Sequence, residues 1–158
     1  MKLLFICTHN RCRSILSEAI TKHIGGTELI AASAGSSPQG EVHPLTIEYL
    51  TEKGVSTNAL QSQSWHDFEA FEPDVVLTMC DNAAKETCPV WFNNSIQVNW
   101  ALEDPSKNND DEKQQKDAFY NTMDIIERRI EAVLELDHKT LNPDQLKTAF
   151  NEIAQQIN

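Results

Sequence analysis

Leu3-Leu4-Phe5-Ile6-Cys7-Thr8-His9-Asn10-Arg11-Cys12-Arg13-Ser14 is the stretch that decides the fold of this chain. Its first four residues form a short apolar run typical of a buried β-strand, and a helical pattern begins directly afterwards, at Ile15. A strand, a tight loop and a helix in this order stack backbone N–H groups around one point, at the positive end of the helix dipole. The stretch therefore predicts an oxyanion-binding loop, formed by Thr8, His9, Asn10, Arg11, Cys12, Arg13 and Ser14.

Two side chains in this stretch indicate chemistry as well as binding. Arg13 is charged at any working pH and offers a planar fork that can bind two anion oxygens. The same positive potential favours the thiolate form of Cys7, which makes Cys7 the candidate nucleophile. Ser14 can donate its hydroxyl to that sulfur or cap the helix, and the sequence leaves both open. Because the loop contains no glycine, we expect Asn10 to adopt the positive φ that a tight loop requires.

Bulk properties narrow the classes of protein to consider. With 158 residues the chain has the length of one domain with a full core. A net charge of −11 argues against a nucleic-acid partner, because phosphate contacts require clustered Lys and Arg. No apolar run approaches the length needed to span a membrane, and the apolar start is too short for a signal peptide. We therefore expect a cytoplasmic protein without a membrane partner, whose Cys residues are reactive or metal-bound.

Strand and helix patterns alternate along the chain. Strands are predicted at 2–6, 28–33, 74–79 and 96–100, helices at 14–24, 43–53, 62–69 and 112–136, and a last amphipathic helix starting at Pro143. This order predicts an α/β fold, a three-layer sandwich in which a four-stranded parallel sheet carries helices on both faces. We assign residues 1–139 to this domain and residues 140–158 to a C-terminal helical extension packed on it.

Three candidate residues follow predicted strands. In parallel sheets ligands bind beyond the carboxyl ends of the strands, which is where Cys7, Cys80 and Asp104 fall. A carboxyl group that faces a bound anion has its pKa raised by like charge, so Asp104 could donate a proton to an oxygen leaving group. Glu103 could play the same part, and a plain loop carboxylate is the alternative for Asp104.

Cys80 and Cys88 form a second point of interest. In a continuous helix their Cα atoms would lie about 12 Å apart at ~1.5 Å per residue. A disulfide needs roughly 7 Å or less, so direct pairing requires the segment between them to unwind. That segment lacks large apolar residues and ends at Pro89, which lowers the cost of rearranging it. A buried Cys80 with an unrelated surface Cys88 is the alternative, and the Cys spacings match none that structural zinc favours.

The motifs together carry a family resemblance over residues 1–136. Cys7-x5-Arg13-Ser14, Ser33-Ala34-Gly35 after the second predicted strand, and Asp104-Pro105 make the chain similar to the low-molecular-weight tyrosine phosphatase superfamily. Within it, the added pair Cys80 and Cys88 resembles the arsenate reductases of that fold, because a reductase must pass on two electrons and needs further thiols.

The resemblance implies an arsenate reductase that detoxifies arsenic and gives arsenical resistance. Cys7 would attack arsenate bound in the loop, while Asp104 protonates the departing oxygen. Cys80 would then attack Cys7, releasing arsenite, and Cys88 would attack Cys80 and carry the redox-active disulfide to the surface. Thioredoxin, or glutathione with glutaredoxin, would reduce that disulfide.

The resemblance also concerns cofactors. It implies none that is tightly bound, but some members hold a potassium ion through positions that match Asn10, Glu18 and Ser33. A further acidic ligand would fall near Ser64, where the chain offers no carboxylate unless Asp67 takes that place.

Two other functions remain open from the sequence. A phosphatase would hydrolyse phosphomonoesters through a Cys7 phosphocysteine, with Cys80 only guarding Cys7 against oxidation, and a reductase could keep residual phosphatase activity. Phosphate and arsenate have nearly the same shape, so the loop alone does not decide. Ser106-Lys107-Asn108-Asn109 offers no aromatic ring to stack on a phosphotyrosine. A non-enzymatic thiol sensor or anion-binding module would keep the thiols but would not explain Asp104.

Overall fold

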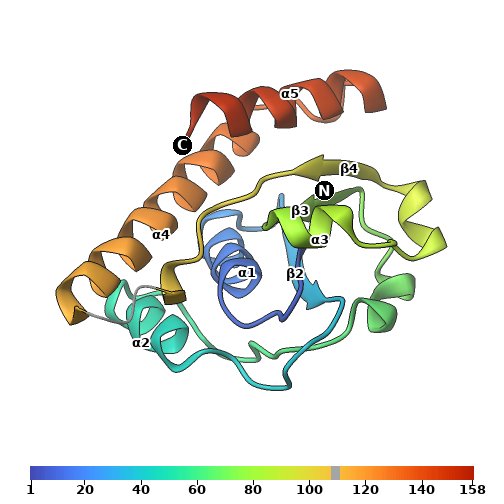
Figure 1. Cartoon of the computed structure of the whole chain (residues 1–158). Helices are drawn as coiled ribbons and strands as arrows, with labels where there is room; N and C mark the ends of the chain where they lie inside the picture. The colour runs from blue at the N-terminus through green and yellow to red at the C-terminus, as the bar shows by residue number, and fades with distance from the viewer. Residues whose placement is uncertain (108–110) are drawn as a thin grey trace.

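One parallel sheet organises the chain, and the computed structural model describes residues 1–107 and 111–158 of it. Its strands are β1 (Lys2–Cys7), β2 (Ile30–Gly35), β3 (Val75–Thr78) and β4 (Ile96–Asn99), in the order β2-β1-β3-β4 (Figure 1). Every pairing is parallel. The predicted α/β fold with a four-stranded parallel sheet is confirmed.

Helices surround the sheet. The longer ones are α1 (Arg13–Ile24), α2 (Pro44–Glu52), α4 (Glu112–Leu134) and α5 (Pro143–Gln156), and the shorter ones are α3 (Asp81–Lys85) and the 3₁₀ helices η1 (Trp65–Phe71), η2 (Val90–Asn94) and η3 (Pro105–Lys107). Helices α1 and α4 pack against each other on one side of the sheet, and η1, α3 and η2 lie on the other side (Figure 1).

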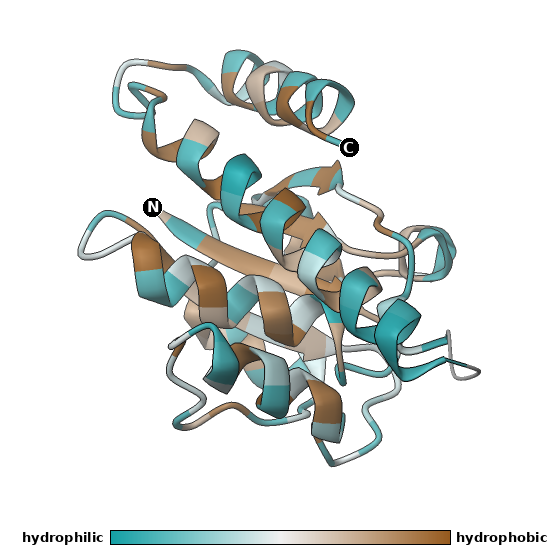
Figure 2. Cartoon of the chain, turned by 90° about the vertical axis from the view of Figure 1, so that its left-hand side faces the viewer, coloured by the Kyte–Doolittle hydropathy of each residue, from teal (hydrophilic) through white to brown (hydrophobic). Residues whose placement is uncertain are grey.

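The central strand explains the apolar run at the start of the chain. Leu3, Leu4, Phe5 and Ile6 are fully buried, because β1 pairs on both edges and is covered on both faces. Figure 2 shows the hydrophobic strands between helices whose outer sides are hydrophilic. The carboxyl end of β1 is therefore rigid, and the loop that follows it starts from a fixed point.

The C-terminal helix α5 is fastened to the end of β4. Trp100 Nε1 donates to the Phe150 carbonyl at 2.9 Å, and the two rings stack. Arg129 of α4 is buried and donates to the carbonyls of Trp100 and Ile157. Burial lowers the pKa of Arg129 to about 10, which still leaves it charged at neutral pH. These bonds tie the last strand, α4 and α5 into one packed corner.

Some predicted boundaries were wrong. The second strand starts at Ile30 instead of residue 28 and runs to Gly35, so Ser33-Ala34-Gly35 lies within the strand and not after it. Its pairing continues because Gly35 lies opposite Cys7 and its N–H donates to the Gln63 carbonyl. The helix expected at 62–69 is the 3₁₀ helix η1, which begins at Trp65 after its cap, Ser64. Asn108 and Asn109 lie outside the described residues.

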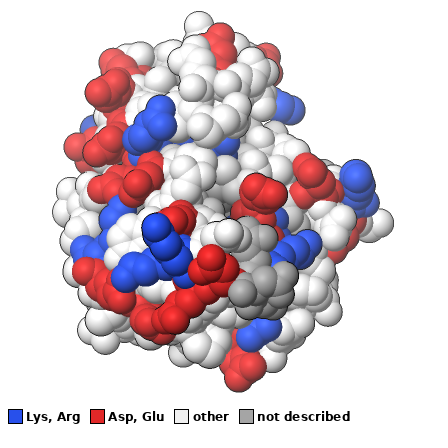
Figure 3. Space-filling view, turned by 60° about the vertical axis from the view of Figure 1, so that its left-hand side comes forward, with Lys and Arg blue, Asp and Glu red and all other residues white. Residues whose placement is uncertain are grey.

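The surface reflects the acidic composition. On the face shown in Figure 3, acidic side chains spread from top to bottom, and the basic side chains stand among them. Lys53, for example, pairs with Asp124 and Glu127. Across residues 1–107 and 111–158, the helices are all too short or too polar to cross a bilayer.

Candidate active site

The predicted oxyanion loop lies between β1 and α1 and is held from below. Asn10 has φ 46°, so the expected positive φ is confirmed. Its side chain is buried, and its Oδ1 accepts from the backbone N–H of Gln63 at 2.8 Å. Gly35 supports the loop from β2, since a Cβ there would lie 2.7 Å from the Thr8 carbonyl oxygen. Position 35 therefore requires glycine, because the loop backbone approaches it too closely for a side chain.

A chain of hydrogen bonds fixes which group donates to the Cys7 sulfur. Because Oδ1 of Asn10 accepts from Gln63, its Nδ2 group must provide the bonds to Ser14 Oγ and Ser33 Oγ, both 2.9 Å long. Ser14 therefore accepts from Asn10 and keeps its own hydrogen for Cys7 Sγ, 2.9 Å away. Cys12, the N-cap residue of α1, makes no side-chain capping hydrogen bond with any described residue. Of the two roles left open for Ser14, the structure supports donation to the sulfur.

The three residues matched to a potassium site also meet. Ser33 Oγ donates to Glu18 Oε2 at 2.6 Å, and Ser33 in turn accepts from Asn10. The Glu18 carboxylate is buried, yet the ammonium group of Lys22, one helical turn later, pairs with its other oxygen. Lys22 was missed by the sequence reasoning, although its i, i+4 spacing from Glu18 is a recognisable pattern.

Arg13 and Asp104 face each other across the site. Arg13 Nη2 donates to Asp104 Oδ2 at 3.1 Å and Nη1 to the Leu102 carbonyl at 2.9 Å. The buried Nε of Arg13 has no hydrogen-bond partner among the described residues. The N–H group at Nε is therefore available to donate to an anion bound in the loop.

The pKa of Asp104 is lowered in the free site. Burial pushes it up, but hydrogen bonds from Ser106 and the charges of Arg13 and Lys107 outweigh burial, so the net pKa lies below its usual value. The predicted rise concerns Asp104 facing a bound anion and stays a prediction, because in the free site Asp104 faces the Arg13 guanidinium.

The second and third thiols sit on either side of α3. Cys80 is buried, and its Sγ accepts from the Ala83 N–H at 3.4 Å and lies 3.8 Å from Thr8 Oγ1. Cys88 is half-buried and donates to the Glu86 carbonyl at 3.7 Å. Burial and the Glu86 charge raise the pKa of Cys88. Helix α3 ends at Lys85, so the stretch between the two thiols is not a continuous helix.

Cys12 differs from the other thiols. It is buried inside the loop, and burial raises its pKa to about 12 although a hydrogen bond with Thr46 opposes the rise. All four cysteines are free. Within the described residues no three His, Cys, Asp or Glu side chains gather as metal ligands, so the zinc alternative finds no support there.

The candidate site is a cavity of about 180 Å³ at the carboxyl ends of the strands. Cys7, Arg13, Cys80 and Asp104 all line it, as predicted. Its lining also contains residues that the sequence reasoning missed or assigned no role, namely His43, Asn82, Ser106 and Lys107. The volume suits a small tetrahedral anion, being below the roughly 300 Å³ at which pockets for larger ligands begin.

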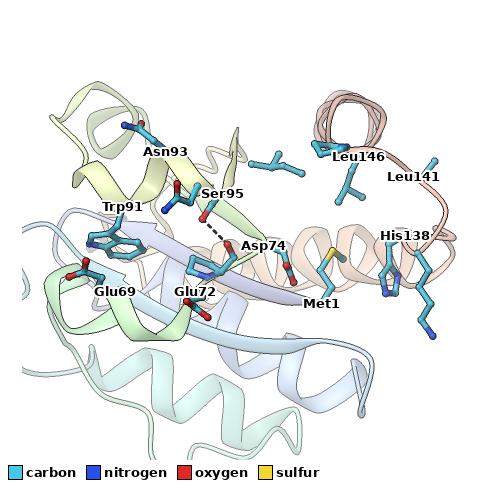
Figure 4. A pocket seen from close by; sticks show the side chains of 15 residues that line it. Met1, Glu69, Glu72, Asp74, Trp91, Asn93, Ser95, His138, Leu141 and Leu146 are labelled. Atoms are coloured by element: carbon cyan, nitrogen blue, oxygen red, sulfur yellow. Dashed lines mark hydrogen bonds between the residues drawn. The ribbon is translucent and has the colours of Figure 1, made fainter.

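A larger hollow of about 930 Å³ lies at the opposite edge of the sheet (Figure 4). Met1, Asp74 and Ser95, at or just before the starts of their strands, line it together with Trp91 and Leu146. Ser95 Oγ donates to the Pro73 carbonyl there. No cysteine lines this hollow, and the amino ends of parallel strands are not where such folds bind substrates.

Comparisons with known proteins agree with this geometry. The family model described as low molecular weight phosphotyrosine protein phosphatase matches residues 2–147. Over 84% of this chain and 95% of the relative, the chain is 28% identical to the glutaredoxin arsenate reductase of Synechocystis sp.. It is 30% identical to an arsenate reductase of Halalkalibacterium halodurans, over 84% of this chain and 94% of that one. A solved arsenate reductase in the phosphate binding state superposes with a TM-score of 0.70 at 28% identity, covering 84% of this chain and 95% of the other.

Proposed function

The chain belongs to the low molecular weight phosphotyrosine protein phosphatase family and, within it, to the arsenate reductases, and we propose that Cys7, Cys80 and Cys88 carry its reaction in turn. The observation that carries this proposal is that Cys7 and Cys80 line one small cavity, with the Thr8 side chain in contact with Cys80. A phosphatase needs only the first of these thiols. The reduction of arsenate needs both Cys7 and Cys80.

The first step is attack by Cys7 on arsenic. The loop amides and Arg13 hold the arsenate oxygens, and the hydrogen bond from Ser14 stabilises the Cys7 thiolate before it attacks. An oxygen leaves arsenic as water, and Asp104 lies on the same cavity to protonate it.

Anion binding prepares Asp104 for this task. In the free site Arg13 holds Asp104 ionised. An arsenate that binds Arg13 breaks the ion pair between Arg13 and Asp104. Asp104 then faces the negative charge of the arsenate instead of the guanidinium. The pKa of Asp104 then rises, and the carboxyl group can take up the proton that it later donates.

The remaining steps move two electrons from thiols to arsenic. Cys80 attacks the Cys7 sulfur, the sulfur–arsenic bond breaks, and its electron pair stays on arsenic, so that arsenic(V) leaves as arsenite. Cys88 attacks Cys80 in the resulting disulfide and releases Cys7 as a thiolate. Because α3 is short and Cys88 is half-exposed, this exchange brings the disulfide toward solvent. A thiol reductant, thioredoxin or glutathione with glutaredoxin, reduces it.

The potassium position is filled by the chain itself in this proposal. A cation beside the loop would compensate the buried Glu18 carboxylate, but Lys22 already does so, while Ser33 uses its hydrogen on Glu18. Asn10 presents its Nδ2 group to Ser33, and an amide N–H cannot be a cation ligand. These residues therefore fit an internal ammonium better than a potassium ion.

The experiment is arsenate-dependent NADPH consumption coupled to thioredoxin with its reductase and, in parallel, to glutathione with glutaredoxin. We expect turnover with one of the two systems. Turnover should collapse in Cys88→Ser, although this variant should still release one arsenite per chain in a single turnover. Thr87→Ser, at the exposed neighbour of Cys88, is the matched control and should keep turnover. No arsenite from the wild-type chain, with hydrolysis of p-nitrophenyl phosphate unaffected by Cys88→Ser, would assign the site to the phosphatase alternative.

A further inference from the structure

Glu86 is a carboxylate in the segment that joins the two resolving thiols. It follows α3, and Thr8 Oγ1 donates to its Oε1 at 3.1 Å. The backbone carbonyl of the same residue accepts from Cys88. Its other carboxylate oxygen, Oε2, is buried and has no hydrogen-bond partner among the described residues. Nothing in the relay described above gives Glu86 a role.

The direction of these hydrogen bonds identifies a proton path. A threonine hydroxyl has one hydrogen, and Thr8 gives it to Glu86. The 3.8 Å contact between Thr8 Oγ1 and Cys80 Sγ must then be a bond in which the Cys80 thiol donates. The hydrogen of Cys80 thus points to Thr8, and that of Thr8 points to the carboxylate.

We propose that Glu86 accepts the Cys80 proton through the Thr8 hydroxyl when Cys80 attacks Cys7, an inference that rests on the thiol relay proposed above. As the sulfur–sulfur bond forms, the Cys80 proton passes to Thr8 and the Thr8 proton to Glu86. The sulfur–arsenic bond breaks with its electron pair on arsenic, and arsenite leaves. Glu86 then releases the proton to solvent. It is a positioning residue, because it acts on the reacting sulfur through Thr8.

This role lets Cys80 act as a nucleophile although its sulfur carries the hydrogen that points to Thr8. An ordinary cysteine is only a few per cent thiolate at pH 7, so attack without a base would use that small fraction. A path to an acceptor allows the proton to leave during the attack. Oε2 of Glu86 has no hydrogen-bond partner among the described residues, so its lone pairs can accept the proton.

The test compares Glu86→Gln with its parent in a Cys88→Ser background, where the reaction stops at the Cys7–Cys80 disulfide. Glutamine keeps an oxygen that accepts from Thr8 but cannot take a proton. In rapid-quench single turnovers with arsenate at pH 7, we expect disulfide formation in Glu86→Gln to be about 30-fold slower, the ratio that a few per cent of thiolate implies. The deficit should shrink as the pH rises toward 9.

Two further variants separate chemistry from local structure. Thr8→Val should match Glu86→Gln, and Thr8→Ser should restore the parent rate because it keeps the hydroxyl. Asp81→Asn removes an exposed carboxylate from the same short helix and should leave the rate unchanged. A Glu86→Gln rate equal to the parent, or a deficit that stays constant with pH, would overturn the proposal.

A second oxidant separates failure of this inference from failure of the proposed function. Hydrogen peroxide oxidises Cys7 to a sulfenic acid, and attack by Cys80 then yields the same disulfide and water. This closure also requires the Cys80 proton to leave. If the parent releases no arsenite, the arsenate reductase proposal fails, but the peroxide reaction still decides on Glu86 by the same pH-dependent deficit in Glu86→Gln.

Discussion

Arg13 Nη2 and Asp104 Oδ2 lie 3.1 Å apart, so the anion-binding cation and the candidate proton donor are paired with each other in the free site. The two residues come from the start of α1 and from the loop after β4, and both are largely buried. A substrate anion must compete for Arg13. The pair therefore links anion binding to the protonation of Asp104.

Sulfate binding should be accompanied by proton uptake. Sulfate is tetrahedral and does not titrate near pH 5, so uptake at that pH reports on the protein. We expect the pKa of Asp104 to rise when sulfate engages Arg13, and calorimetry in two buffers of different ionisation enthalpy measures the protons taken up. Asp104→Asn should bind sulfate without that uptake. Equal uptake by both proteins would contradict the coupling.

The free protein should show the matching dependence of stability on acid. The folded pKa of Asp104 is lowered, so its contribution to stability is present above the unfolded value near 3.8 and is lost as the pH falls further. Urea unfolding between pH 5 and pH 3 should therefore show a shallower loss of stability for Asp104→Asn than for the wild type.

Ser14→Ala should slow alkylation of Cys7. A hydrogen bond to a charged group contributes about 1.5 kcal/mol or more, which corresponds to about a tenfold lower rate with iodoacetamide at pH 6.5. Mass spectrometry of the Cys7 peptide follows the reaction. Ser17→Ala is the control, because Ser17 is also buried on α1 but bonds to the Arg13 carbonyl. Equal rates in wild type and Ser14→Ala would refute donation to the sulfur.

Cys12 should resist the same reagent. With its pKa raised to about 12 by burial, Cys12 stays a thiol up to at least pH 9 in the folded protein. We expect iodoacetamide at pH 8 to label Cys7 and leave Cys12 unmodified until urea is added. Labelling of Cys12 in the folded protein would show that the loop opens.

Gly35→Ala should displace the oxyanion loop. The new Cβ would lie 2.7 Å from the Thr8 carbonyl oxygen, and such overpacking costs about 1–3 kcal/mol. Both the affinity for phosphate and the stability should fall. Gly40→Ala adds a methyl group at an exposed turn with φ +82° and no atom nearby. That variant should lose some stability but bind phosphate as the wild type does.

Lys22→Met should make the protein respond to potassium. Removing the ammonium leaves the buried Glu18 carboxylate without its cation, and a loss of about 1–3 kcal/mol would lower Tm by about 3–9 °C. Potassium chloride, compared with choline chloride at equal ionic strength, should restore part of the Tm and of arsenate turnover. The wild type and Lys53→Met, which breaks a surface ion pair, should not respond. A wild type that needs potassium would contradict the role of Lys22.

The oxyanion loop could be predicted because it is local in sequence. Cys7, Arg13 and Ser14 lie within eight residues, and a strand, a tight turn and a helix leave that segment few conformations. The positive φ of Asn10 followed from the same constraint. The apolar run of β1 likewise determined a strand buried on both faces, and the alternating pattern determined the parallel sheet.

Relations between distant segments needed the tertiary structure. The register of β1 with β3, which places Ile6 opposite Thr78, brings Cys80 to the Thr8 side chain. The packing of the loop after β4 against Arg13 and the hydrogen bonds from Ser106 lower the pKa of Asp104 in the free site. Glu86 gave no signal of its role, because an isolated Glu in a sequence usually indicates a solvated surface.

The sequence by itself thus determined the fold class, the candidate nucleophile and the loop of the candidate site, whose geometry depends on neighbouring residues. Only the tertiary structure decided the partners that come from distant segments, that is Arg13 with Asp104 and Thr8 with Glu86. The physical reason is that a side chain's electrostatic environment is set by atoms within a few ångströms, and in this fold most of those atoms come from other strands and helices.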